Sequence, residues 1–235
     1  MSNNEVNTTK KTVVLVHGAF ADGSSWEKVI PLLEARGAHV VAVQNPLSSL
    51  ADDVAATKRV IEQQNGPVVL VGHSWAGVVI SEAGNEDKVK NLVYVAAFAP
   101  DSGQSIEDIT KGKPAPVWAS ELQKDSAGNL TLSTKAVLED FAQDVPLPQR
   151  RVIAATQGPW ASACIGEKVT KAAWHDKPSY FVVTERDRMI DPGLQQTMAK
   201  NIGAHVTLAN ASHVAMVSQP KLVADTIIAA AKAAQ

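Results

Sequence analysis

Short apolar runs that alternate with longer amphipathic stretches restrict the fold of this chain more than any other feature. The apolar runs are residues 12–16, 39–43, 67–71, 91–98, 179–184 and 205–209. Apolar side chains recur at helical spacing in residues 26–36, 50–64, 75–83, 192–202 and 221–234. Strands without polar alternation are buried on both faces, as in parallel sheets covered by helices. The sequence therefore predicts an α/β fold with a mainly parallel six-stranded sheet flanked by helices.

The alternation stops once, between residues 99 and 177. This stretch is richer in Pro, Gly, Ser and Lys, and helical patterns occur around Ile106, over residues 117–122 and over residues 134–142. Loops of this length without structure of their own are uncommon. We therefore expect residues 99–177 to form a helical cap inserted after the fourth strand. Residues 12–98 and 178–235 then form the core, and the polar residues 1–11 a disordered tail.

Composition excludes several classes of partner and cofactor. The 22 Lys and Arg nearly balance the 24 Asp and Glu, so we expect no nucleic-acid partner. Cys164 is the single cysteine and can form neither an internal disulfide nor a thiolate zinc site. The sequence contains no H-E-x-x-H, C-x-x-C or P-loop motif. We expect no metal and no cofactor.

The ends and hydropathy of the chain predict a cytoplasmic protein without a membrane span. The first ten residues contain no apolar segment typical of a signal peptide, and no run of 18 apolar residues occurs. A leader removed from the native protein and a homodimer are both compatible with the sequence.

The segment Gly72-His73-Ser74-Trp75-Ala76-Gly77 follows the apolar run PVVLV and precedes an apolar helical pattern. A G-x-S-x-G motif in this strand–turn–helix context is typical of a nucleophile elbow, which exposes the serine hydroxyl at the end of a sheet. Ala76 replaces the second glycine, and Gly77 directly after it is expected to let the turn accept the extra methyl. We predict Ser74 as the nucleophile; the alternative is a turn of small residues without chemistry.

A serine nucleophile needs a neighbouring base, which in folds with this elbow follows the acid and the serine in the chain. His213 comes directly after the last predicted strand, at the sheet edge where such folds bind their ligands. His175 precedes a strand, and His205 opens one. We predict His213 as the base, with His175 as the alternative.

A carboxylate is needed to orient the histidine. Asp187 lies just after the predicted strand 179–184, between Arg186 and Arg188, and an ion pair with either arginine would be its structural explanation. Asp191 precedes Pro192, which is typical of a helix N-cap. We predict Asp187 as the acid, with Asp191 and Glu185 as alternatives.

Acyl transfer also requires two backbone N–H donors for the developing oxyanion. One donor is the residue after the nucleophile, Trp75, and the other comes from the loop after the first strand. In that loop we predict Ala19 first and Phe20 second. His17 is expected to hold this loop by hydrogen bonds.

Together the segments VLVHGAF, VGHSWAG, VTERDRMI and ASHVAMVSQP resemble the α/β-hydrolase superfamily over nearly the whole chain from Thr12 onward. They are similar to the small-cap esterases related to plant methylesterases and hydroxynitrile lyases. The resemblance implies the triad Ser74–His213–Asp187 and the oxyanion donors Ala19 and Trp75. It also implies a core without the two leading strands of the largest members.

The same fold supports several chemistries. The related hydroxynitrile lyases have Thr and Lys where this chain has Gly18 and Val214. We expect Gly18 to leave room for a water near Ser74, and Val214 offers no cation for a cyanide leaving group. The sequence therefore favours a carboxylesterase-type serine hydrolase acting on a small acyl or aryl ester. A hydroxynitrile lyase-like activity, an acyltransferase and a non-catalytic receptor for small ligands are the alternatives.

We expect the substrate pocket between the sheet edge and the cap. The residues predicted to line it are Phe20, Trp118, Trp160, Met189, Ile190 and Val214. Packing of the cap onto the core is the alternative role for each cap tryptophan.

Overall fold

The computed structural model describes residues 11–234, so residues 1–10 of the expected tail (1–11) lie outside the described residues. Its main sheet has six parallel strands in the order β2-β1-β3-β4-β8-β9. The strands are β1 (Thr12–Val16), β2 (His39–Val43), β3 (Val68–His73), β4 (Val89–Val95), β8 (Ser179–Thr184) and β9 (His205–Ala209). Every residue of β1 and β3 is buried, whereas the edge strands β2 and β9 are partly exposed. The predicted parallel sheet is confirmed.

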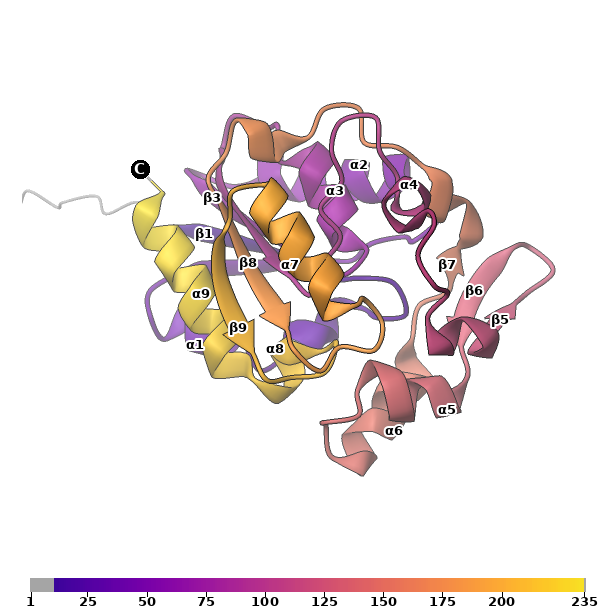
Figure 1. Ribbon diagram of the computed structural model, residues 1–235. Helices are drawn as coiled ribbons and strands as arrows, with labels where there is room; N and C mark the ends of the chain where they lie inside the picture. Colours follow the sequence, from indigo (N-terminus) through magenta and orange to yellow (C-terminus); the bar gives the residue numbers. More distant parts are fainter. Residues whose placement is uncertain (1–10, 235) are drawn as a thin grey trace, which may run out of the picture.

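Helices cover both faces of this sheet (Figure 1). On one side α2 (Leu50–Glu62) packs against α3 (Ala76–Ala83), and on the other α1 (Ile30–Glu34) packs against α9 (Pro220–Ala233). Helix α7 (Pro192–Asn201) packs against β8, and the short α8 (Ala215–Ser218) leads into α9. The apolar stripe of each helix therefore meets a sheet that is itself apolar on both faces.

Two elements differ from the expected boundaries for local reasons. The helix expected over residues 26–36 is a 3₁₀ turn, η1 (Gly23–Trp26), followed by the short α1. Pro31 stands at the start of α1, and a proline further inside a helix would clash with the preceding turn. The fourth strand ends at Val95 because Ala96 adopts a left-handed backbone with φ 44°.

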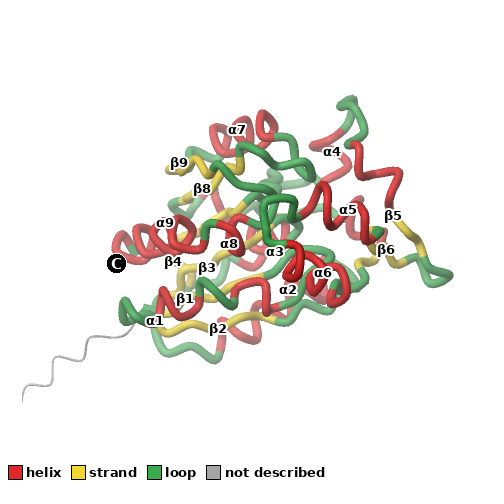
Figure 2. The backbone as a smooth tube through the Cα atoms, turned by 90° about the horizontal axis from the view of Figure 1, so that it is seen from below, coloured by secondary structure: helices red, strands yellow, loops and turns green. Residues whose placement is uncertain are grey.

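Between β4 and β8 the chain forms an inserted cap. It is helical, as expected, and also contains a three-stranded antiparallel sheet that the sequence analysis did not predict. Figure 2 shows its strands β5 and β6 apart from the main sheet, on the side opposite the C-terminal end. The cap elements are α4 (Ile106–Thr110), η2 (Val117–Glu121), β5 (Leu122–Lys124), β6 (Asn129–Leu132), α5 (Thr134–Ala136), η3 (Val137–Phe141), α6 (Leu147–Thr156), β7 (Trp160–Ala161), η4 (Ser162–Gly166) and η5 (Ala173–His175).

The turn from β3 into α3 requires glycine at two positions. A Cβ atom on Gly77 would lie 1.9 Å from the Phe98 carbonyl oxygen, and one on Gly72 would lie 2.6 Å from the Ala76 carbonyl oxygen. Both contacts are with backbone, which cannot move aside cheaply. The methyl group of Ala76, in contrast, is fully buried within the turn. The elbow therefore accepts alanine at residue 76, and its close approaches are made by Gly72 and Gly77.

Gly77→Ala should lower the free energy of unfolding by about 1–3 kcal/mol or more, because the new methyl overlaps the Phe98 carbonyl. Urea denaturation of the two proteins measures the difference. Gly166→Ala is the matched control, since its Cβ would meet only the Glu107 carboxylate at 3.4 Å. Equal denaturation midpoints for Gly77→Ala and the wild type would contradict the packing described.

Candidate active site

Ser74 sits at a strained turn at the carboxyl end of β3. Its backbone has φ 55°, the left-handed region that a side chain with a Cβ rarely adopts. The turn is held by its own backbone: the Ser74 amide donates to the Val95 carbonyl at 3.2 Å, and its carbonyl accepts from the Phe98 amide at 3.2 Å. This conformation gives Ser74 a geometry compatible with a nucleophile elbow.

His213 lies beside Ser74, although 139 residues separate them in the chain. It is buried in the loop between β9 and α8, and its Nε2 is 2.8 Å from Ser74 Oγ. The Phe141 ring of the cap packs edge-on against the imidazole, with ring centroids 5.2 Å apart. His175, the alternative base, is instead a partly exposed group whose Nε2 pairs with Asp101 at 2.7 Å.

Asp187 completes a hydrogen-bonded chain of three side chains. Its Oδ2 is 2.8 Å from His213 Nδ1, and its carboxylate is fully buried. The same oxygen accepts from Thr184 Oγ1 at 2.8 Å and from Gln195 Nε2 at 2.9 Å. The second oxygen accepts from the backbone amides of Met189 and Ile190. Five donors, His213 among them, therefore hold the carboxylate in place.

The alternatives weighed for the acid have other positions. Asp191 caps α7, with its Oδ1 accepting from the Leu194 amide at 2.9 Å, as its sequence context predicted. Glu185 is exposed. Arg186 and Arg188 form their ion pairs with Asp144 and Asp140 of the cap, at 3.8 and 3.5 Å. The ion pair considered as a structural role for Asp187 is therefore not formed with these arginines.

The predicted oxyanion donors lie in the two turns that flank Ser74. Trp75 is the N-cap of α3, and Ala19 and Phe20 lie in the loop after β1. Phe20 has φ 59°, which turns this loop sharply. No residue between 11 and 234 accepts a hydrogen bond from the amide of Trp75 or Ala19.

Gly18 brings the loop after β1 against the elbow. A Cβ atom on it would lie 2.8 Å from both the His73 carbonyl oxygen and Ser74 Cβ. The expectation that Gly18 leaves an open space for a water is therefore wrong: the glycine is needed because the two backbones touch. His17 holds the same loop, since its Nε2 accepts from the Asn45 amide at 2.9 Å and its Nδ1 contacts the Gly18 carbonyl at 2.9 Å.

Two histidines behind the triad are held neutral. Burial lowers the pKa of His73 well below its usual value, and the nearby His213 acts in the same direction. Burial also lowers the pKa of His17. The neutral His73 ring donates from Nε2 to the His213 carbonyl oxygen at 2.9 Å. His73 thereby fixes the backbone of the residue that contacts Ser74.

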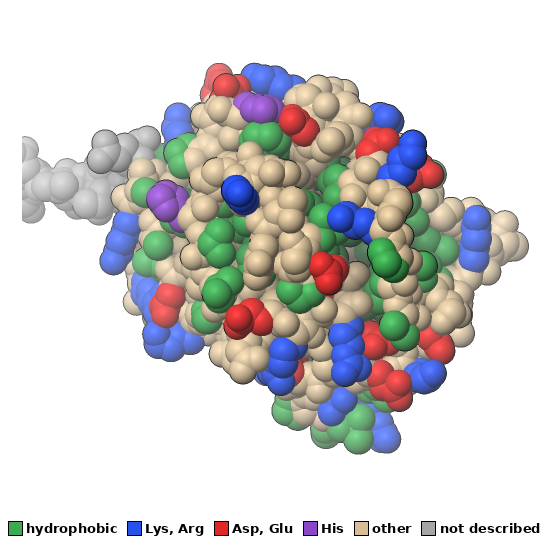
Figure 3. Space-filling view, viewed as in Figure 1, with side chains coloured by type: hydrophobic (Ala, Val, Ile, Leu, Met, Phe, Trp, Pro, Cys, Tyr) green, Lys and Arg blue, Asp and Glu red, His purple; other side chains and the backbone are tan. Residues whose placement is uncertain are grey.

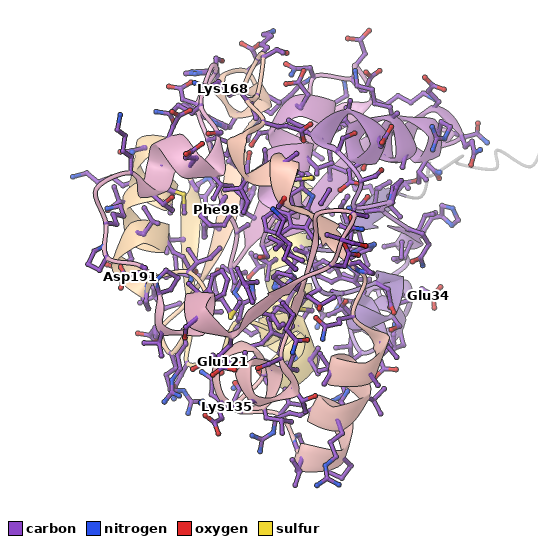
Figure 4. All side chains as sticks on the ribbon, turned by 90° about the vertical axis from the view of Figure 1, so that its right-hand side faces the viewer. Glu34, Phe98, Glu121, Lys135, Lys168 and Asp191 are labelled. Carbon is purple, nitrogen blue, oxygen red and sulfur yellow. The ribbon has the colours of Figure 1, made fainter. Side chains whose placement is uncertain are left out.

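Four of the six residues predicted to line the substrate pocket fall into two hollows, and Trp118 and Trp160 line neither of these. Phe20 and Val214 line a cavity of about 90 Å³ between the core and α6, whereas Met189 and Ile190 line a larger one of about 800 Å³. The larger hollow lies between α7 and the segment after α4, and Figure 3 shows hydrophobic side chains within it. Figure 4 labels Phe98 and Asp191, which both line it.

The two cap tryptophans make contacts with the core. Trp118 donates from Nε1 to the Met189 carbonyl oxygen at 3.1 Å. Trp160 is buried and packs against Phe20 and Trp75, with ring centroids 5.8 and 5.4 Å apart. These contacts fix the cap to both the acid loop and the elbow.

Several residues around the triad carried no readable sequence signal. Thr184 and Gln195 position the acid, Phe141 packs on the base, and Asp53 accepts from the Trp75 indole at 2.8 Å. Each of these side chains reaches its partner through tertiary packing, which periodicity and motifs do not reveal.

Two further features bear on ligands and location. Among residues 11–234, no three His, Cys, Asp or Glu side chains cluster as metal ligands would. No helix within that range is long and apolar enough to span a membrane.

Comparisons with known proteins identify relatives along the whole length. A sequence profile described as the Alpha/beta hydrolase family matches residues 13–226. Methylesterase 2 of Arabidopsis thaliana is 29% identical, over 94% of this chain and 96% of that protein. The Alpha-hydroxynitrile lyase of the same plant is 25% identical, over 94% and 97%. The crystal structure of a pyrethroid hydrolase from Sphingobium faniae JZ-2 superposes with a TM-score of 0.82 at 22% identity, covering 96% of this chain and 98% of that one.

Replacing His73 should change how stability depends on pH. Because the pKa of His73 is lowered in the folded protein, the unfolded chain binds a proton at this residue that the folded protein does not. The free energy of unfolding of the wild type therefore decreases as pH falls below about 6.5. His73→Gln keeps a side-chain N–H donor without this titration. The free energy of unfolding of the wild type relative to His73→Gln should therefore fall on acidification, by at most about 1.4 kcal/mol per pH unit. Parallel stability–pH curves would contradict a buried neutral His73.

Proposed function

The chain belongs to the alpha/beta hydrolase family, and from this premise we propose that it is a serine esterase cleaving a carboxylic ester of a small acyl or aryl substrate. One observation carries the proposal. Ser74 Oγ, His213 and Asp187 form an unbroken chain through two contacts of 2.8 Å, all of it shielded from solvent. The hydrolase and esterase relatives support ester hydrolysis in general.

The proposed reaction proceeds through an acyl-enzyme. His213 Nε2 takes the proton from Ser74 Oγ as the oxygen attacks the ester carbonyl. The amides of Trp75 and Ala19 stabilise the oxyanion. His213 then passes the proton to the leaving alcohol oxygen. A water repeats the sequence and releases the acid, which restores Ser74.

The surroundings of His213 support its role as a proton carrier. Asp187 lies at Nδ1, so the neutral imidazole carries its proton there and presents an unprotonated Nε2 to Ser74. When Nε2 is protonated, the buried carboxylate stabilises the imidazolium. The five donors to Asp187 keep that carboxylate oriented throughout.

We propose that the substrate enters from the 800 Å³ hollow beside α7. Met189, Ile190 and Phe98 supply apolar surface there, and the Phe98 amide is bonded to the Ser74 carbonyl. An apolar wall of this kind, with Phe98 bonded through its backbone to Ser74, supports a small acyl or aryl group as the part of the substrate bound there. The proposed partner is accordingly a small-molecule ester.

Ser74→Ala should lower kcat for a short-chain aryl ester at least about 10³-fold, because the attacking oxygen is removed. The measurement is release of the coloured phenol, with circular dichroism to verify folding. Ser126→Ala changes an exposed serine of the cap turn and serves as the matched control. Turnover that survives in Ser74→Ala would contradict the proposal, and so would the absence of ester turnover by the wild type across a panel of acyl and alcohol lengths.

The variants Asp187→Asn and Asp191→Ala should distinguish which of the two carboxylates acts as the acid. Asp187→Asn should reduce kcat by about 10³–10⁴-fold, since the amide no longer stabilises the imidazolium. Asp191→Ala should keep kcat within about tenfold of the wild type and lower the free energy of unfolding by about 1 kcal/mol through loss of the α7 cap. Steady-state kinetics and urea denaturation of both variants test this. The reverse pattern would assign the acid to Asp191.

A further inference from the structure

Asp53 is a buried carboxylate that the proposed reaction does not use. It lies in the first turn of α2 with no exposed surface. Its Oδ1 accepts from the Leu47 amide at 2.7 Å, and its Oδ2 accepts from the indole Nε1 of Trp75 at 2.8 Å. Among the ion pairs of residues 11–234, none involves Asp53. A buried carboxylate without a cation is costly, which calls for a reason to retain it.

The group that Asp53 holds is the residue next to the nucleophile. Trp75 follows Ser74 directly, and its side chain is 1% exposed. One edge of the indole is bonded to Asp53, and its ring packs against Trp160 of the cap. The Trp75 backbone is the N-cap of α3 and has no side-chain cap of its own. The indole contacts with Asp53 and Trp160 therefore hold the Trp75 side chain, in addition to the backbone bonds that hold the turn.

We propose that Asp53 is a positioning residue of the oxyanion site: its ionised carboxylate anchors the Trp75 indole and thereby aims the Trp75 amide at the developing oxyanion. The proposal rests on the proposed esterase function. A positioning residue differs from a merely structural anchor in one respect: the charge of Asp53 should affect the rate of the chemical step.

The surroundings of Asp53 are acidic on both sides. Asp52 precedes it on α2, and Glu167 of the cap contacts the same helix by accepting from the Leu50 amide at 2.6 Å. Cys164 also lies in this cluster, with burial raising the pKa of its thiol to about 12. Burial first, and then the charges of Asp52 and Glu167, raise the pKa of Asp53 to about 6, against the opposing hydrogen bonds from Trp75 and Leu47.

Protonation should affect stability and catalysis in opposite directions. The pKa of Asp53 is about 6 in the folded protein against an ordinary 3.8, so the folded state binds this proton more tightly. The free energy of unfolding, relative to an Asp53→Asn variant, therefore increases as pH falls through about 6. Protonation, however, converts one carboxyl oxygen of Asp53 from an acceptor into a donor. Because each oxygen accepts from an N–H group, the proton weakens the hydrogen bond from either the Trp75 indole or the Leu47 amide. We therefore expect acidification to loosen the anchor on Trp75 while the folded state gains stability relative to Asp53→Asn.

The test is a double-mutant cycle of Asp53→Asn and Trp75→Phe. Asparagine preserves the shape but has one acceptor oxygen for two N–H donors, and phenylalanine removes the indole donor. We expect Asp53→Asn to lower kcat about tenfold with KM within about threefold, less than the 10²–10³-fold typical of losing a whole oxyanion donor. In the Trp75→Phe background, the same substitution should change kcat less than about twofold. Asp52→Asn is the matched control for kcat, since its exposed carboxylate accepts from Ser48 Oγ at 2.7 Å, whereas the Trp75 indole bonds to Asp53.

A spectroscopic signal makes the result independent of turnover. The Trp75 indole proton, assigned by its loss in Trp75→Phe, should titrate in NMR spectra with a midpoint near pH 6 in the wild type and stay constant in Asp53→Asn. Equal effects of Asp53→Asn in both backgrounds would overturn the proposal, as would an indole signal that does not titrate. An unchanged kcat beside a titrating signal would reduce Asp53 to a structural anchor. Failure of the esterase assignment appears separately, as turnover that survives Ser74→Ala.

Discussion

The left-handed backbone of Ser74 is the constraint on which the rest of the site depends. A side chain at φ 55° is strained, so its neighbours must hold the turn. Three close approaches of neighbouring backbone, each at a glycine, hold the turn. Gly72 lets α3 approach β3, Gly77 lets it approach the segment after β4, and Gly18 brings the loop after β1 against His73 and Ser74. At each of these positions a single methyl group would meet backbone atoms.

Parallel strands explain how distant residues reach this turn. The carboxyl ends of β3, β8 and β9 lie along one edge of the sheet, and the residues that follow them are Ser74, the acid loop and the histidine loop. The sheet order places β4 between β3 and β8. His213 follows β9, on the other side of β8 from Ser74, and its side chain extends back across the ends of β8 and β4 to contact Ser74. The edge of a rigid sheet thus sets distances that loops alone would not hold.

This arrangement also determines what the sequence could predict. Ser74, Asp187 and His213 each follow a strand that the sequence predicts, so their placement at one edge follows from strand order and motif, and the structure brings them together. The small cap sheet was missed because β5, β6 and β7 are two to four residues long, which is too short for a strand period to stand out in the sequence. Asp53 and Gln195 were missed for another reason. A polar residue on a helix looks the same in sequence whether it faces water or a buried indole.

Residues of the cap directly contact the loops that carry Asp187 and His213. Asp140 and Asp144 pair with the arginines on either side of Asp187, and Asp144 also accepts from the Ser212 amide at 2.8 Å, one residue before His213. Ion pairs whose arginine is exposed, as here, contribute little stability individually. Here, however, one cap segment touches both the acid loop and the histidine loop, while Phe141 packs against the imidazole. Displacing that segment would loosen the two loops together, so the order of the cap is coupled to the geometry of the Ser74, His213 and Asp187 side chains.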